Sequence, residues 1–256
     1  MLFRHARSLL AFALLVLVIV SGGCSRESRL RARCLGGEVA VCTQLGDEYM
    51  GGKDIGRNIA RAVEMYEHAC SGGVSDVCNT LGEIYERTEL EGGMDRASQY
   101  YAKACDGHNS AGCLNLGLFF LAKDQKEKAV SLFERSCSGG WAPGCHQLAT
   151  SYEEGEGVTR DFAKAIAHYG EACDLEHTES CLALGNKYLT GDLGTKDPAL
   201  ASKFFARAVA LFDMGCKAGL ENDCTERDKI RTRMVAAAAT ATTAPLPPQP
   251  DATVIK

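Results

Sequence analysis

Cysteines are the residues of this sequence whose type and spacing point most plainly to chemistry. The chain holds thirteen, and twelve of them form pairs in which seven residues separate the two members. Within one α-helix such a separation rises about 12 Å, whereas the Cα atoms of a disulfide lie about 4.4–6.8 Å apart. A disulfide within a pair therefore requires the chain to turn back between its cysteines. The pairs are Cys34/Cys42, Cys70/Cys78, Cys105/Cys113, Cys137/Cys145, Cys173/Cys181 and Cys216/Cys224.

Two other chemistries compete for so many cysteines. Zinc sites favour C-x2–4-C ligand pairs that meet as four, a spacing that these pairs lack. A redox or metal carrier needs reactive free thiols, and the even pairing of the twelve cysteines argues against one. We therefore predict six local disulfides, no metal and no cofactor. Disulfides of this kind persist outside a reducing cytoplasm.

The N-terminus indicates export. Arg4 and Arg7 precede an apolar run over residues 9–20, and "SGGC" follows at residues 21–24. The run is too short to span about 30 Å of hydrocarbon, but it suits the core of a secretory signal. We expect residues 1–23 to form a signal peptide of the lipoprotein type.

The cysteine after the small residues resembles that of a bacterial lipobox, although Ser21 stands where leucine is usual. We expect Cys24 to be lipidated and residues 24–33 to form a short tether. Cleavage of an ordinary signal peptide nearby is the alternative. The mature chain would be a periplasmic or outer-membrane lipoprotein, or secreted, and only its lipid would contact a membrane.

The cysteine pairs also mark an internal repeat. Successive pairs begin 36, 35, 32, 36 and 43 residues apart, a period typical of helix-pair solenoids. After each of the first five pairs, leucine, a small residue and an aromatic follow at helical spacing, and we name this the A helix. Before each of the last five pairs lies Ala-x3-aromatic-x2-small-Cys, the B helix. The A-helix stripes are Leu45, Gly46, Tyr49; Leu81, Gly82, Tyr85; Leu116, Gly117, Phe120; Leu148, Ala149, Tyr152; and Leu184, Gly185, Tyr188. The B-helix aromatics are Tyr66, Tyr101, Phe133, Tyr169 and Phe212.

Each cysteine pair falls across a repeat boundary, between the end of a B helix and the start of the next A helix. Most of the linkers between them carry glycine, as "SGG" at 71–73 does, which ends a helix. We predict an all-α solenoid of about five helix pairs over residues 34–234, closed by the charged cap helix "TERDKIRTRMV". Residues 235–256, rich in Ala, Thr and Pro, should form a disordered tail.

These stripes, together with "GEGVTRDFAKAIAHY", resemble the Sel-like repeat family, which is related to the tetratricopeptide repeats. With C-x7-C in every repeat, the chain resembles the secreted, cysteine-rich branch often labelled β-lactamase-like or Hcp-like. The resemblance covers about residues 34–224. It implies the solenoid fold strongly and the activity only loosely, because a fold hosts many functions.

A solenoid commonly binds a partner's peptide on its concave wall. By analogy with tetratricopeptide repeats, the A helix lines that wall through the residues one, five and eight positions after its cysteine. In the third repeat these positions hold leucines, and an exposed leucine row is unusual unless something covers it. Packing of the row against the short connection that follows is the alternative. The candidate partner-binding residues are Leu114, Leu118, Leu121, Asp47, Asn79, Glu83, His146 and Asn186.

The sequence thus favours a monomeric, envelope-anchored or secreted scaffold that binds a protein or peptide. The resemblance implies one alternative, a β-lactam-binding protein or a weak β-lactamase. A serine enzyme of that class needs S-x-x-K, which the sequence lacks together with S-D-N and K-T-G. The six histidines are scattered, so we assign no catalytic residue. The net charge of −5 argues against nucleic-acid binding.

Overall fold

The computed structural model describes residues 25–53, 55–88, 92–192, 194 and 196–242, with side chains through residue 234. Within these residues the chain forms twelve helices and no strand, as the repeat pattern predicts. The helices are α2 (Arg26–Leu35), α3 (Val39–Gly51), α4 (Ile59–Ser71), α5 (Ser75–Arg87), α6 (Gly93–Asp106), α7 (Ser110–Ala122), α8 (Lys126–Ser138), α9 (Ala142–Glu154), α10 (Phe162–Asp174), α11 (Thr178–Thr190), α12 (Pro198–Lys217) and α13 (Glu221–Thr242).

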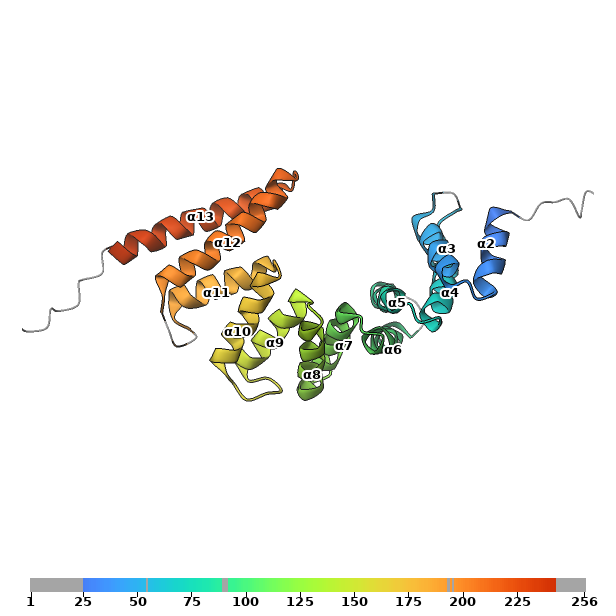
Figure 1. Ribbon diagram of the computed structural model, residues 1–256, viewed down its shortest axis with the longest axis horizontal. Coiled ribbons are helices and arrows are strands. Elements are labelled where there is room, and N and C mark those ends of the chain that lie inside the picture. The colour runs from blue at the N-terminus through green and yellow to red at the C-terminus, as the bar shows by residue number, and fades with distance from the viewer. Residues whose placement is uncertain (1–24, 54, 89–91, 193, 195, 243–256) are drawn as a thin grey trace, which may run out of the picture. The chain divides into compact units, whose positions relative to one another are not determined.

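The chain divides into two units, one ending at Gly107 and the other beginning at His108. Within each unit, consecutive helices follow one another as hairpins (Figure 1). Odd-numbered helices from α3 to α13 are A helices, and even-numbered helices from α2 to α12 are B helices. The fold is therefore an α-solenoid of five A–B pairs with a half-repeat at each end.

A small residue on each A helix lets the following B helix come close. A Cβ atom built at Gly82 would lie 2.3 Å from the ring of Tyr101, and one at Gly117 would lie 2.6 Å from Phe133. Both aromatic rings are buried. The leucine-small-aromatic stripe of the sequence is thus the contact line between paired helices.

All six C-x7-C pairs are disulfides, as predicted. Five of them have Cα–Cα distances between 4.4 and 4.9 Å, and each joins the end of a B helix to the start of the next A helix. Cys105 and Cys113 are disulfide-bonded as well. The linkers reverse the chain through a left-handed residue, such as Gly73 at φ 93°. Glu176 takes this conformation in the linker that lacks glycine, at φ 64°.

The disulfides of the first unit lie in the core. Cys42 is bonded to Cys34 and Cys78 to Cys70, which confirms both pairings. Cys42 is only 1% exposed and Cys78 only 2% exposed, on the first turns of α3 and α5. We predicted these cysteines as members of disulfides, and in the folded chain they are too buried to contact a partner. The function of Cys42 and Cys78 is therefore structural, as covalent links between neighbouring helices.

The tether predicted at residues 24–33 is wrong from residue 26 onward, because these residues form helix α2. The Ser25 side chain caps this helix by accepting a hydrogen bond from the Ser28 N–H. Leu30 and Cys34 are buried on it, so α2 packs as a B helix in front of the first complete repeat. The charged residues that suggested a tether lie on its exposed face. Residues 1–24, with the expected signal and Cys24, lie outside the described residues.

In the last B helix, the sequence pattern assigned the wrong aromatic residue to the buried position. Helix α12 has 20 residues, whereas α10 has 13, so it is seven residues longer. Seven residues make about two helical turns, so the stripe recurs on the same face. Phe205, which is 1% exposed, packs on Gly185, and Phe212 is only partly buried. Phe205 is therefore the counterpart of the other B-helix aromatics, and the prediction of Phe212 was wrong.

Helix α13 begins as the predicted charged cap and buries Ile230 against α12. It continues to Thr242, eight residues into the segment that we expected to be a disordered tail. The reason is the run of alanines after Val235, since alanine has the highest helix propensity. Residues 243–256 lie outside the described residues.

Candidate functional site

The predicted partner-binding positions lie on the A helices, and we name them the A-helix face. The structure divides the leucine row of α7. Leu114 is buried among Ala129, Phe133 and Cys137, so its expected exposure is wrong. Leu121 is partly buried against the same cluster, and Leu118 is 38% exposed. The row is therefore core at its first position and exposed to solvent in its middle.

Most of the cysteines predicted to form disulfides are too buried to contribute to this face. Ten of the twelve are buried, and a buried disulfide offers no group to a partner. The buried cysteines are Cys34, Cys42, Cys70, Cys78, Cys105, Cys113, Cys137, Cys145, Cys173 and Cys181. Cys216 and Cys224 are partly exposed.

Acidic residues of the A-helix face accept hydrogen bonds from B-helix tyrosines. The Tyr66 hydroxyl donates to Asp47 over 2.7 Å, and the Tyr101 hydroxyl donates to Glu86 over 2.5 Å. Burial of the rings, reinforced by the carboxylates, raises the pKa of both phenols. Each tyrosine thus packs in the core through its ring and holds a carboxylate at the surface through its hydroxyl.

The same arrangement recurs in the second unit. The Tyr169 hydroxyl donates to Glu153 over 2.9 Å, and the hydroxyl of Thr150 lies 2.9 Å from it. Glu153 also forms an ion pair with Lys187 of the next A helix. Sequence reasoning treated these tyrosines as core only. The sequence contains a signal for these hydrogen bonds. Each repeat with a B-helix tyrosine has an acidic residue five or eight positions after the cysteine of its A helix, and the repeats with Phe133 or Phe205 do not.

Two of the predicted polar positions are held by neighbours within their own unit. Asn79 is nearly buried, and its amide donates to Glu83 over 3.0 Å. Asn186 accepts a hydrogen bond of 2.6 Å from Arg233 of the cap helix α13. Asn186 is therefore already engaged by the cap, which leaves α7, α9 and the first turns of α11 as the more open part of the face in the second unit.

His146, the remaining predicted position, belongs to a polar cluster that the sequence did not reveal. Its Nδ1 lies 2.8 Å from the Ser180 hydroxyl, and the Nδ1 of His177 lies 2.8 Å from the same hydroxyl. The two imidazole rings are 5.1 Å apart, and His146 also packs edge-on against Tyr169. The cluster joins α9, α10 and α11.

The serine restricts the proton positions of the two histidines. A hydroxyl has one proton, so Ser180 donates to one Nδ1 and accepts from the other. When both rings are neutral, one must carry its proton on Nδ1 and the other on Nε2. Burial lowers the pKa of His146, and the charge of a protonated His177 would lower it further. Burial also lowers the pKa of His177, against the opposing charge of Glu179.

The cluster has the residue types of a serine nucleophile but not the access. Ser180 is completely buried, so no substrate reaches its hydroxyl from solvent.

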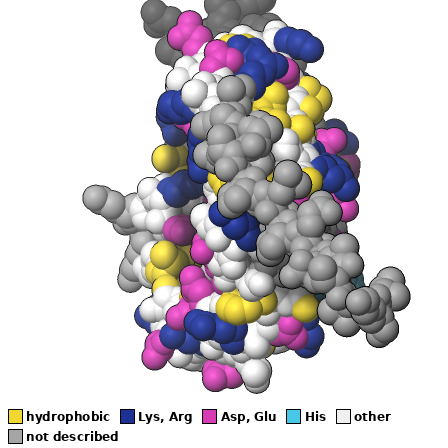
Figure 2. All heavy atoms as spheres, turned by 90° about the vertical axis from the view of Figure 1, so that its left-hand side faces the viewer, with side chains coloured by type: hydrophobic (Ala, Val, Ile, Leu, Met, Phe, Trp, Pro, Cys, Tyr) yellow, Lys and Arg dark blue, Asp and Glu magenta, His cyan; other side chains and the backbone are white. Residues whose placement is uncertain are grey.

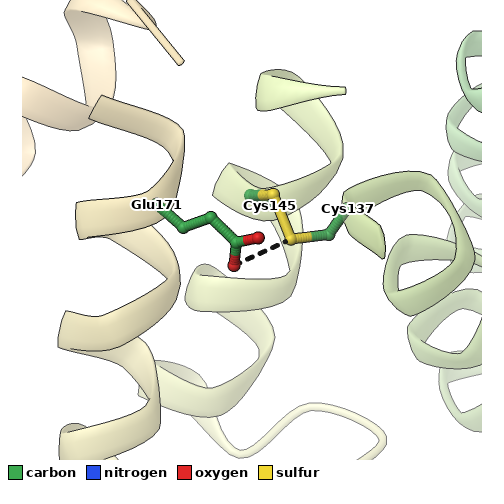
Figure 3. Close-up of side chains that lie close together, drawn as sticks. All are labelled: Cys137, Cys145 and Glu171. Carbon is green, nitrogen blue, oxygen red and sulfur yellow. Dashed lines mark hydrogen bonds between the residues drawn. A yellow bond between two sulfur atoms is a disulfide. The ribbon is translucent and has the colours of Figure 1, made fainter. Parts of the chain in front are cut away.

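Among the described residues, one group of three has side-chain atoms close enough to share a metal: Cys137, Cys145 and Glu171 (Figure 3). The two sulfurs are bonded to each other, and a disulfide is not the thiolate that binds metals.

Charges of both signs are mixed on one face of the molecule. On the face drawn in Figure 2, Lys and Arg side chains lie interspersed with Asp and Glu, with small hydrophobic patches between them. None of the described helices has the length and apolar content required to cross a bilayer.

The sequence pattern of the Sel1 repeat matches residues 39–74, 110–141, 142–177 and 178–220, more than half of the chain. The chain belongs to the Sel1 repeat family. Proteins of this family generally bind protein partners. The finer resemblance to the β-lactamase-like branch stays a prediction.

Several proteins of known sequence or structure are similar to this Sel1 repeat chain. Cytochrome c oxidase assembly factor 7 of Xenopus tropicalis is 28% identical over 54% of the chain and 65% of its own length. The protein of that name from Danio rerio is 30% identical over 66% of the chain and 79% of its own length. The chain thus spans slightly less than two thirds of the Xenopus relative.

Two solved structures share the fold. A Sel1 repeat protein from Oxalobacter formigenes superimposes with a TM-score of 0.60 at 20% identity, over 71% of this chain and 75% of its own. The protective antigen c5321 of uropathogenic Escherichia coli gives 0.66 at 21% identity, over 87% of this chain and 54% of its own.

Proposed function

We propose that this chain is an envelope-anchored or secreted scaffold that binds an extended peptide of a protein partner on its A-helix face. The observation that carries the proposal is the set of hydrogen bonds from Tyr66, Tyr101 and Tyr169 to carboxylates of that face. Side chains that are already ordered lose less rotamer entropy when a partner binds. The hydrogen bonds therefore prepare the face for recognition.

In the second unit the face combines an apolar and a polar part. Leu118 and Leu121 of α7 supply apolar contact, and His146, Thr150 and Glu153 of α9 supply hydrogen-bonding groups. The two helices contact each other. A peptide that lies across them would bury leucine and meet a polar row, which suits an amphipathic segment.

The relatives support an interaction role. Those from Xenopus and Danio rerio are named as assembly factors of cytochrome c oxidase, and an assembly factor acts through contact with other proteins. We propose for this chain only the general property of binding a protein partner.

The proposed location rests on the cysteines. Six disulfides indicate a compartment outside the reducing cytoplasm. The apolar run at residues 9–20 and the small residues before Cys24 support export and lipidation, and Ser25 in place of aspartate favours the outer membrane by the usual sorting rule of Gram-negative bacteria.

The alternative, β-lactam binding or hydrolysis, gains no support from the described residues. Ser180 is the serine that lies against two histidines, and it is buried. It is also followed by alanine, not lysine, three positions on. We keep the scaffold as the proposed function.

The test is capture of a partner by the full chain and by two matched leucine variants. Leu118→Asp places a charge on the A-helix face, where Leu118 is 38% exposed, and Leu175→Asp places one at the end of α10, where Leu175 is 42% exposed. Burial of a leucine contributes about 1.5–3 kcal/mol. Leu118→Asp should therefore weaken capture about tenfold or more.

Neither variant should lower the melting temperature strongly, because both leucines are partly exposed already. Binding is measured by calorimetry against the captured protein once mass spectrometry has identified it. Equal loss of affinity in both variants, or no loss in either, would contradict a binding site on the A-helix face.

A further inference from the structure

One of the disulfides differs from the others in its exposure. The cysteines of the five pairs from Cys34/Cys42 to Cys173/Cys181 are all buried, at most 5% exposed. Cys216 and Cys224, which join α12 to α13, are both partly exposed. A thiolate must reach a disulfide sulfur along the S–S axis to attack it, so access is the first requirement for exchange.

The sulfur of Cys216 also lies beside a cation. Nη1 of Arg227 donates to the Cys216 Sγ over 3.3 Å. Arg227 is held there by Asp213 at 3.0 Å and Asp228 at 2.8 Å, and Arg231 binds Asp213 from the next turn of α13. The two aspartates balance the two arginines, but the group in direct contact with the sulfur is the guanidinium. A donor in this position stabilises a thiolate on Cys216.

A buried disulfide of the same unit shows the opposite arrangement. In Figure 3 the Glu171 carboxylate approaches the Cys137 sulfur, with an Oε2–Sγ distance of 3.3 Å. A carboxylate at this distance disfavours a thiolate on Cys137 and repels an incoming one. Cys137/Cys145 therefore lacks both the partial exposure and the neighbouring guanidinium of Cys216/Cys224, and it serves as an internal control.

We propose that Cys216–Cys224 is a thiol–disulfide exchange site, whose co-reactant is an exposed thiol. The incoming thiolate attacks Sγ of Cys224 and forms a mixed disulfide there, while the Sγ–Sγ bond breaks and its electron pair leaves on Cys216 as a thiolate beside Arg227. A second external thiolate then attacks the sulfur of the first thiol in this mixed disulfide. The two external thiols leave joined to each other as a disulfide, and Cys224 is released as a thiolate. Two thiols are oxidised, and the protein disulfide gains two electrons and two protons.

The packing of α12 with α13 allows this exchange without loss of the cap. These two helices contact each other about as extensively as the helices within a repeat do. Ile230 anchors α13 against Phe205, independently of the disulfide. Helix α13 should therefore stay in place when the disulfide opens.

The experiment treats the native full chain with reduced glutathione, quenches it with an alkylating reagent and maps the labelled and glutathionylated cysteines by mass spectrometry. We expect Cys216 and Cys224 to react at least about tenfold faster than Cys137 and Cys145, with the early glutathione adduct on Cys224. Equal rates for all disulfides, or faster reaction of Cys137/Cys145, would overturn the proposal.

Two matched variants test the role of the guanidinium. Arg227→Gln removes the donor to Cys216, whereas Arg231→Gln removes a cation that binds the same aspartate without contacting the sulfur. Arg227→Gln should slow the exchange roughly threefold or more and spread the adduct over both cysteines, because the leaving thiolate loses its donor. Arg231→Gln should leave the adduct on Cys224. The same adduct ratio in both variants would show that Arg227 does not direct the reaction.

Discussion

Gly185 and Phe205 show at the scale of single residues how the repeats are held together. A Cβ atom at Gly185 would lie 2.6 Å from the ring of Phe205, which is too close for any unshifted contact. The fourth repeat carries Ala149 at the equivalent position, so a repeat can accommodate a methyl group when its aromatic is placed to suit it. The distance between paired helices is thus set locally, one pair at a time.

We predict that Gly185→Ala destabilises the protein, whereas Gly170→Ala does not. The added methyl group at residue 185 must push Phe205 aside, at a cost of about 1–3 kcal/mol in the free energy of unfolding. Gly170, inside α10, has no atom within 4 Å of an added Cβ, so alanine there should stabilise the helix by about 1 kcal/mol. Denaturant unfolding of both variants measures the difference, and a stabilising Gly185→Ala would refute the close approach.

The histidine pair makes stability depend on pH. The folded-state pKa values of His146 and His177 lie below the unfolded value of about 6.5. As the pH falls below about 6.5, the unfolded chain therefore binds protons that the folded chain does not, and this favours unfolding. The contribution of the pair to stability is present above pH 6.5 and is lost toward the lower folded pKa values.

We therefore expect the melting temperature to fall between pH 7.5 and 5.5. In a chain that carries His146→Gln and His177→Gln, the fall should be smaller, because the groups that take up the protons are absent. The comparison uses the slope of melting temperature against pH, since the variant also loses hydrogen bonds to Ser180. An unchanged slope would assign the pH dependence to other groups.

At the scale of helices, the disulfides lie where packing is weakest. Each A helix of the second unit contacts the B helix that follows it more extensively than α8 contacts α9 or α10 contacts α11. Those two boundaries carry the buried disulfides Cys137–Cys145 and Cys173–Cys181. A covalent bond thus supports the interfaces where the helices contact each other less. The boundary between α12 and α13 departs from this rule, since it combines extensive packing with a disulfide.

We predict that the disulfides contribute unequally to stability. Replacement of Cys173 and Cys181 by alanine removes a nine-residue loop closure worth about 2.5 kcal/mol and leaves a weakly packed boundary. The same replacement at Cys216 and Cys224 should cost clearly less, because packing of α13 remains. Guanidinium unfolding of the two double variants gives the comparison, and equal or reversed losses would contradict it.

At the scale of the whole molecule, half-repeats close both ends of the solenoid. Helix α2 covers the start of the first unit, where Arg26 binds Glu48 and Arg61 binds Glu27. Helix α13 covers the end of the second unit and exposes most of its charged side chains. In a stack whose repeats contact only their neighbours, such polar ends prevent further stacking. We therefore predict a monomer, which light scattering can test.

We predict that Cys24 attaches the molecule to a membrane. Cys24→Ser should move the protein from the membrane fraction to the soluble fraction, because the lipid is the only expected membrane contact. Its melting temperature should stay unchanged, since the described helices begin at Arg26 and do not include this residue. Retention in the membrane fraction after a salt wash would contradict lipidation of Cys24.

The sequence by itself determined the repeat, the alternation of two helix types and the disulfide pairing. These features depend on spacings within one hairpin, and a short period such as C-x7-C identifies both ends of the contact. Tertiary structure decided the rest. It selected Phe205 over Phe212, although both satisfy the same stripe, and it buried Leu114 while it left Leu118 exposed. It also brought His146 and Ser180, 34 residues apart, to one hydrogen bond. Periodicity identifies the face of a helix, but the distance to the next helix decides which residues on that face meet a neighbour and which meet solvent.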